Sequence, residues 1–224
     1  LPVNLDAISA KELRRAAQSL RNGKAAGPDG KPVEFWKALL NSGKTEGAEW
    51  LLSFCNAVWS GKAVPNDWHL QQVTMIYKKG DTSKYENYRP ISLLNTIYKI
   101  LAAVEQRRIA EGMDKHLQKT QFGFRKNKST ADAIYLMRRT AEHGEKTRNK
   151  VIMVLLDWEK TFDEVDREGM MEAIQRLGAP EKIRNVIKQI YIYIYKKTEF
   201  LVEIEGESSG WKTQHTGIRQ GCPL

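Results

Sequence analysis

The stretch at residues 151–166 holds the side chains whose types and spacing best suit chemistry. Six consecutive apolar residues, 151–156, are followed at once by Asp157, and Phe162 comes five positions later. This run predicts a strand buried on both faces, so an ionised carboxylate at its end needs a compensating cation. The pattern favours Asp157 as a ligand of a divalent metal in a phosphate site, although a lone aspartate at a strand end is more often a cap or turn residue.

A second group of candidate residues is basic. Lys78, Lys79 and Arg89 lie around a turn between two segments with strand character, 71–77 and 88–93, which predicts a basic hairpin. Arginine offers a planar fork to anionic oxygens and lysine a point charge, so the set suits a triphosphate. A Lys-Lys pair alone is a common surface feature, and the prediction rests mainly on Arg89.

The charge of the chain is basic and unevenly distributed. Lysine and arginine number 36 against 27 aspartates and glutamates, and residues 99–150 hold thirteen basic and six acidic side chains. Such a surplus favours binding to a phosphate backbone, because each neutralised phosphate releases counterions. A solvated helical face is the plain alternative.

Cysteine content and hydropathy exclude several other classes of protein. Cys55 and Cys222 lie far apart and indicate neither a disulfide framework nor a zinc site. The longest apolar run is too short to span a bilayer and no signal-like segment opens the chain, so we expect an intracellular protein with no membrane partner. Because Leu1 is not an initiator methionine and Leu224 ends within a turn, we expect a piece of a longer protein.

The elements that must position these residues are mainly helices. Ser9 and Glu12 form a capping box for a first helix, and Ser129 begins a cap for a helix that runs to about residue 146. Arg107 and Arg108 are expected near the outer end of a long amphipathic helix. The mixture predicts an α/β (α+β) fold, rich in helices with short antiparallel sheets. The other expected elements are helices near 32–40, 46–60, 96–116, 167–177 and 180–193, and strands at 199–204 and 211–216.

Five motifs, taken in order, resemble those of the reverse transcriptases of non-LTR (LINE-type) retrotransposons. They are Gly-Lys-Ala-Ala-Gly-Pro-Asp-Gly at 23–30, Tyr-Arg-Pro-Ile-Ser-Leu-Leu-Asn at 88–95, Gln-Phe-Gly-Phe-Arg at 121–125, Leu-Asp-x-x-Lys-x-Phe-Asp-x-Val-Asp at 156–166 and Gly-Ile-Arg-Gln-Gly at 217–221. The resemblance implies a right-hand polymerase. Residues 1–150 would be the N-terminal extension and fingers, and 151–224 the first part of the palm, ending before the aromatic-x-Asp-Asp hairpin.

The resemblance also implies a reaction and a set of site residues. The intact enzyme would add dNTPs to a DNA primer on an RNA template with two Mg²⁺ ions, for which Mn²⁺ is an alternative. Asp157 would be catalytic and bind metal together with the backbone carbonyl of Trp158, whereas Asp163 is expected to be structural. The implied dNTP-binding residues are Lys78, Lys79, Arg89, Phe162, Gln220 and Gly221, and the implied nucleic-acid-binding residues are Gly123, Arg125, Lys126, Lys128 and Arg219.

Two other functions fit the same sequence: a catalytically dead, RNA-binding remnant and a reverse transcriptase of the group II intron maturase type. Asp157 alone would hold Mg²⁺ poorly, because such sites combine carboxylates with phosphates and waters. We therefore expect that the 224-residue chain does not polymerise by itself. A nuclear location follows if the source is a eukaryotic LINE-type element.

Overall fold

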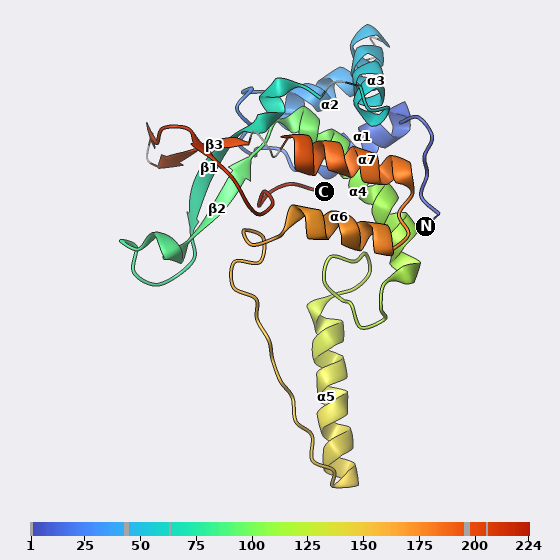
Figure 1. Ribbon diagram of the computed structural model, residues 1–224, viewed down its shortest axis with the longest axis vertical. Helices are drawn as coiled ribbons and strands as arrows, with labels where there is room; N and C mark the ends of the chain where they lie inside the picture. The colour runs from blue at the N-terminus through green and yellow to red at the C-terminus, as the bar shows by residue number, and fades with distance from the viewer. Residues whose placement is uncertain (1, 43–44, 63, 195–197, 205) are drawn as a thin grey trace.

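The computed structural model describes residues 2–42, 45–62, 64–194, 198–204 and 206–224. A helical body with a sheet at one side carries one long helix that projects away from it (Figure 1). None of the helices in the described part has the length and apolar character needed to cross a membrane. The α-helices are α1 (Ala10–Ser19), α2 (Val33–Asn41), α3 (Thr45–Trp59), α4 (Thr96–Met113), α5 (Thr130–Thr147), α6 (Arg167–Arg176) and α7 (Glu181–Lys188). Short helical turns are η1 (Asn66–His69), η2 (Tyr85–Asn87), η3 (Asp114–His116) and η4 (Gln189–Ile194).

Local sequence signals account for where the helices begin. The predicted capping box at Ser9 and the predicted cap at Ser129 are confirmed: the side chain of Ser9 accepts from the backbone N–H of Glu12, and that of Ser129 from the N–H of Asp132. Each cap satisfies backbone donors that have no partner within the helix. The predicted second and third helices are confirmed as α2 and α3, and the predicted helix at 180–193 is α7 continued by the π-helical η4.

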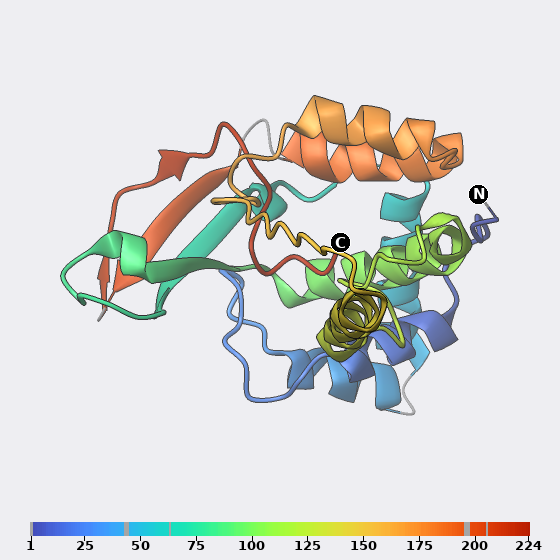
Figure 2. The ribbon, with the colours of Figure 1, turned by 90° about the horizontal axis from the view of Figure 1, so that it is seen from below.

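Helix α4 is the centre of the hydrophobic core. Figure 2 shows it between the α6–α7 pair on one side and α1 and α2 on the other. Tyr98, Ile100 and Leu101 are each at most 1% exposed, and Ile183 of α7 packs into the same cluster. Burial on two sides explains why this helix shows so few exposed positions along its first three turns.

Arg108 lies inside this core, not at the outer end of the helix as expected. Its side chain is 3% exposed, forms an ion pair with Glu12 at 2.7 Å and stacks over the ring of Trp59 at 4.8 Å. It also donates to the backbone carbonyls of Asp6 at 2.7 Å and Ala7 at 3.2 Å. Arg108 therefore ties the N-terminal segment to α4, and its hydrogen bond lowers the pKa of Glu12 to about 2.

The sheet is mixed, which corrects the expectation of purely antiparallel sheets. Strands β1 (Leu70–Tyr77) and β2 (Tyr88–Leu93) form the predicted hairpin, with Tyr77 opposite Tyr88. Strand β3 (Glu199–Ile204) pairs with β1 in parallel, because the chain crosses back through α5–α7 before it enters the sheet. Two short strands, β4 (Glu207–Ser208) and β5 (Lys212–Thr213), pair with β3, and β5 is all that forms of the predicted strand at 211–216.

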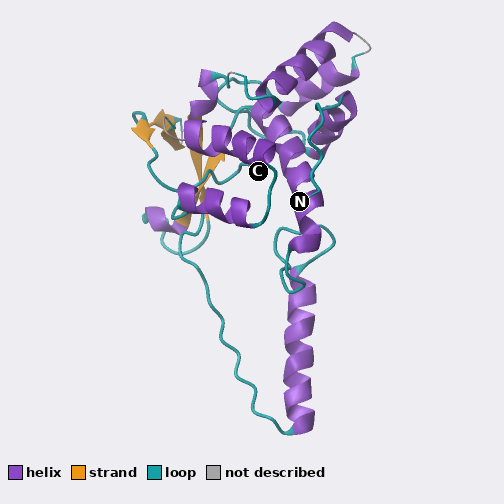
Figure 3. Ribbon diagram, turned by 45° about the vertical axis from the view of Figure 1, so that its right-hand side comes forward, coloured by secondary structure: helices purple, strands orange, loops and turns teal. Residues whose placement is uncertain are grey.

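The prediction of a buried strand at residues 151–156 is wrong. These residues are assigned to no strand, and their exposed fractions range from 40% for Val151 to 82% for Leu156. They run as an extended connection beside α5 (Figure 3), whose residues Ile134 and Tyr135 are also more than half exposed. We call α5 together with residues 148–158 the arm, and the remainder the body. The sheet of the described residues, in the order β2-β1-β3-β4, forms without this run, which therefore has no strand partner there.

Candidate active site

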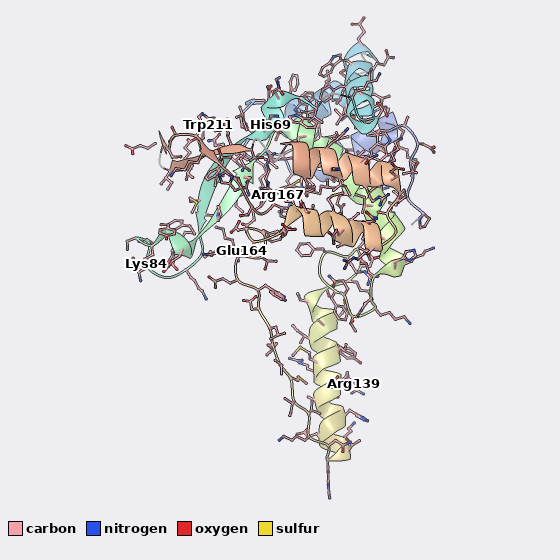
Figure 4. The ribbon with its side chains drawn as sticks, viewed as in Figure 1. His69, Lys84, Arg139, Glu164, Arg167 and Trp211 are labelled. Carbon is pink, nitrogen blue, oxygen red and sulfur yellow. The ribbon has the colours of Figure 1, made fainter. Side chains whose placement is uncertain are left out.

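Residues 217–221 lie between the edge of β2 and the loop at 162–165, and so join three segments that are distant in sequence. The N–H of Ser92 donates to the carbonyl of Gln220 at 2.8 Å, and the N–H of Ile218 donates to the carbonyl of Phe162 at 2.8 Å. Arg167, at the start of α6, donates to the carbonyl of Gly217 at 2.8 Å. In Figure 4, Arg167 and Glu164 lie near this junction, between α6 and the sheet.

Two glycines permit this close approach. Gly217 has φ of +77°, and a Cβ there would lie 2.5 Å from the carbonyl oxygen of Asp163. Gly221 has φ of +116°, and a Cβ there would lie 2.8 Å from the carbonyl oxygen of Ser92. Any other residue would clash with backbone and take a strained conformation, so the glycines of this motif are required by the junction itself.

A groove of about 320 Å³ opens beside the junction. Asp163 and Gln220 share its lining with Ser92 and the face of the sheet formed by Val73 and Met75. Asp163 was predicted to be structural, and the structure also places it in the lining of a groove that could hold a ligand.

Gln71 and Gln214, which the sequence did not single out, also line the groove. Gln71 is 2% exposed and donates to Gln214 at 2.9 Å, while its Oε1 has no hydrogen-bond partner in the described residues. The groove therefore holds a buried acceptor that a ligand could satisfy. No sequence signal separates these glutamines from ordinary strand residues.

The predicted triphosphate-binding residues lie on the β1–β2 hairpin. Arg89 is exposed within β2, opposite Ile76 of β1, and Lys78 and Lys79 are exposed directly after β1 ends. Lys78 continues the pairing with a backbone bond to Asn87 at 2.8 Å. Arg89 is therefore held rigidly three positions from Ser92, whereas the two lysines lie toward the hairpin tip marked by Lys84 in Figure 4.

Asp157 and Trp158 lie at the end of the arm, before the turn that leads into the loop at 162–165. Both are exposed, Trp158 by 79%. Within the described ranges, no group of three or more His, Cys, Asp or Glu side chains could hold a metal ion, and the 224 residues contain no Asp-Asp pair. The described residues therefore do not by themselves supply the carboxylates of the two-metal site that the resemblance implies.

The basic residues of the loop before α5 divide into two kinds. Lys126 and Lys128 are exposed, as is the neighbouring Gly123. Arg125 instead donates to Asp114 at 2.9 Å and to the carbonyl of Gln118 at 2.9 Å, so it fastens the loop. That hydrogen bond holds the pKa of the Asp114 carboxyl below its usual value.

Arg219 is enclosed by the body. It is 4% exposed and donates from Nη2 to the carbonyl of His69 at 3.2 Å and to the hydroxyl of Thr198 at 3.1 Å. In this conformation its guanidinium binds protein groups. Residue type alone did not distinguish Arg219 and Arg125, which bind protein groups, from Lys126 and Lys128, which stay exposed.

Three of the ordered motifs meet at this junction, as expected for the nucleic-acid polymerase class that the motif order resembles. Residues 76–224 match the family described as reverse transcriptase (RNA-dependent DNA polymerase). Because this match covers more than half of the chain, the protein belongs to the reverse transcriptase family.

The curated relatives are proteins of mobile elements. The chain is 27% identical over 223 residues to the transposon TX1 uncharacterized 149 kDa protein of Xenopus laevis. This match covers 100% of this chain and 16% of the Xenopus protein. It is 26% identical to the probable RNA-directed DNA polymerase from transposon BS and to the RNA-directed DNA polymerase from mobile element jockey, both of Drosophila melanogaster. These matches cover 97% and 98% of this chain but 23% of each relative, so the chain spans less than a quarter of their length. The reverse transcriptase domain is thus related to those of non-LTR retrotransposons.

Proposed function

We propose that the chain is the nucleotide-binding part of an RNA-directed DNA polymerase of a non-LTR retrotransposon. The observation that carries the proposal is the junction, where backbone hydrogen bonds join Ser92, Phe162 and residues 217–221. Three motifs that are far apart in sequence thereby meet beside one groove. In this assignment residues 1–150 are the N-terminal extension and fingers, and residues 151–224 are the first part of the palm.

The proposed roles follow from the chemistry of each side chain. Arg89 binds the triphosphate of the incoming dNTP through its planar fork, with Lys78 and Lys79 adding positive charge. Phe162 packs against the sugar and leaves no room for a 2′-hydroxyl. Gln220 and Gly221 contact the nucleotide from the junction, and Lys126 and Lys128 contact the backbone of the nucleic acid.

Metal binding requires more than this chain supplies. Mg²⁺ favours oxygen ligands from carboxylates, phosphates and waters, and Asp157 with the Trp158 carbonyl offers only one carboxylate group and one carbonyl group. We therefore propose that polymerisation depends on carboxylates outside these 224 residues. Sustained Mg²⁺-dependent dNTP incorporation by the purified 224-residue protein would refute this part of the proposal.

The test is primer extension by the parent polypeptide that carries these residues, on an RNA template with a DNA primer. We expect Asp157→Ala to abolish incorporation and Arg89→Ala to raise KM for dNTP. Phe162→Val should increase the use of ribonucleotides. Lys84→Ala, an exposed lysine at the hairpin tip, is the matched control and should leave all three quantities unchanged. Equal activity of the Asp157→Ala variant would defeat the proposal.

An RNA-binding protein without catalysis is the second candidate. It is favoured by the exposure of Asp157 and by the lack of a metal-binding cluster in the described residues. In that case Asp157→Ala changes nothing, whereas charge reversal at Lys126 weakens RNA binding and reduces its salt dependence. A maturase-type enzyme is the third candidate, and the transposon and mobile-element relatives from Xenopus and Drosophila favour the retrotransposon assignment over it.

A further inference from the structure

A basic hollow lies under the loop between η3 and α5, away from the junction. Its volume is about 540 Å³, and its lining joins Arg15 of α1 and Arg107 of α4 to Phe124 and Lys126 of the loop. Neither Arg15, Arg107 nor Lys126 forms an ion pair within the described residues. Two acidic residues also line the hollow: Asp114, which is paired with Arg125, and Glu111, whose charge is offset by Lys115 in the same lining. The unpaired charge around the hollow is therefore mainly positive.

Phe124 is held at the rim of this hollow with its ring in solvent. It is 95% exposed, the largest exposure among the large hydrophobic side chains that the structure describes. Its φ of +59° is in the left-handed region, which is costly for a bulky side chain. A residue that is both exposed and strained gains nothing from the fold of this chain alone, which points to a contact with another molecule.

Arg125 enforces this conformation. Its Nε binds Asp114, Nη1 donates to the carbonyls of Gln118 and Gln121 at 2.9 and 3.2 Å, and Nη2 donates to the carbonyl of Asp114 at 3.0 Å. These bonds fix the loop on both sides of Phe124. The neighbouring ring of Phe122 behaves differently, because it is half-buried and Lys128 lies 5.9 Å from its centre.

We infer that Phe124 is a stacking platform for a base of a single-stranded nucleic acid, with Arg15, Arg107 and Lys126 holding the adjacent phosphates. An exposed aromatic ring beside a positively charged hollow matches the two parts of a single strand, an apolar base face and an anionic backbone. The space at Gly123 agrees, because a Cβ there would meet nothing within 4 Å and the chain itself leaves room for a close approach. Arg125 acts as a positioning residue that orients Phe124.

The inference rests on the proposed function only for the identity of the strand, which would be the RNA template. The contact itself requires neither dNTP nor metal. A binding experiment on the 224-residue chain can therefore fail or succeed independently of primer extension by the parent polypeptide.

The experiment compares two fluorescein-labelled probes of equal length by anisotropy: a single-stranded RNA and an abasic ribose-phosphate strand. The abasic probe keeps the phosphates but cannot stack. We expect Phe124→Ala to weaken binding of the RNA about tenfold or more and to leave binding of the abasic strand unchanged. Phe124→Trp should restore the preference for bases. Trp50→Ala, which removes a 57% exposed ring on α3, is the matched control and should change neither affinity.

Lys126→Ala should weaken binding of both probes equally and reduce the salt slope by about 0.7, as expected for one phosphate contact on a single strand. The inference is overturned if Phe124→Ala weakens binding of both probes to the same extent, or leaves both unchanged. It is also overturned if a polyglutamate peptide binds with the same dependence on Phe124, because the hollow would then be a docking site for acidic peptides. Circular dichroism of each variant establishes that it is folded.

Discussion

The body and the arm contain similar apolar side chains, yet the protein buries only those of the body. Leu101 in α4 is fully buried, whereas Leu155 in the arm is 81% exposed. Helix α4 is packed on two sides, but the extended residues 151–156 have only α5 beside them (Figures 2 and 3). Apolar composition therefore determines what can be buried, and neighbouring elements determine what is buried.

The same difference separates the candidate site residues. In the body, Ser92, Phe162 and Gln220 are joined by short backbone hydrogen bonds that fix them relative to each other. On the arm, Asp157 and Trp158 are exposed and are fixed by no comparable junction. The three segments of the junction are therefore fixed relative to each other, whereas the exposed Asp157 is not held by this junction.

The largest expected effect compares one ion pair from each region. Arg108→Ala in the body should lower the free energy of unfolding by about 3–5 kcal/mol, because it removes a buried charge together with its bonds to Glu12 and the backbone. Arg139→Ala in the arm should change it by less than about 0.5 kcal/mol, since Arg139 and Glu142 are both about half exposed. Urea denaturation measures both. Equal losses would contradict the division into body and arm.

The second comparison uses leucines. Leu101→Ala should cost about 2–5 kcal/mol, through lost burial and the cavity that remains. Leu155→Ala should cost less than about 0.5 kcal/mol, because its side chain is already in water. A large loss for Leu155→Ala would mean that the arm packs against a partner in solution, and sedimentation of the two proteins at several concentrations would detect one.

The third prediction concerns Glu105, a buried carboxyl group of the body that makes stability depend on pH. Glu105 is 1% exposed, and neither carboxylate oxygen has a hydrogen-bond partner in the described residues. Burial raises its pKa from 4.5 to about 8, so folding favours the protonated form. The folded state is therefore most stable with respect to this group below pH 4.5, where Glu105 is protonated in both states. As the pH rises toward about 8, the free energy of unfolding falls by up to about 1.4 kcal/mol per pH unit.

Glu105→Gln removes this titration at nearly constant size. Thermal and urea unfolding followed across that pH range should show a shallower pH dependence for the variant than for the unmodified chain. An identical slope for both proteins would show that Glu105 ionises alike in the folded and unfolded states.

Signals carried by short segments predicted the fold well. The caps at Ser9 and Ser129 depend on residues three positions apart, the hairpin of β1 and β2 joins strands that follow each other directly along the chain, and all three formed as expected. The strand at 151–156 did not form, because a strand needs neighbours that its own sequence does not specify. The parallel pairing of β1 with β3 depends on the path of more than a hundred intervening residues.

The candidate site divides in the same way. The resemblance assigned Phe162 and Gln220 to one nucleotide site, which stays a prediction, and backbone bonds place residues 217–221 next to Phe162. The burial of Arg108 and Arg219 and the bonding of Arg125 were beyond reach, because a sequence gives the charge of an arginine but not its partner. Phe124 was quoted within a motif, and only its exposure and φ distinguish it from an ordinary core phenylalanine.

The exposed run at 151–156 also bears on the behaviour of the chain at high concentration. Six apolar residues in an extended conformation, with no proline and no charge among them, have the composition of segments that nucleate cross-β aggregates. Lys150 and Asp157 bracket the run as gatekeeper charges, which hinder the stacking of identical segments. Asp157 would thus limit aggregation in addition to its proposed chemical role. Its replacement by alanine in a catalytic test also removes one of the two charges that hinder self-assembly.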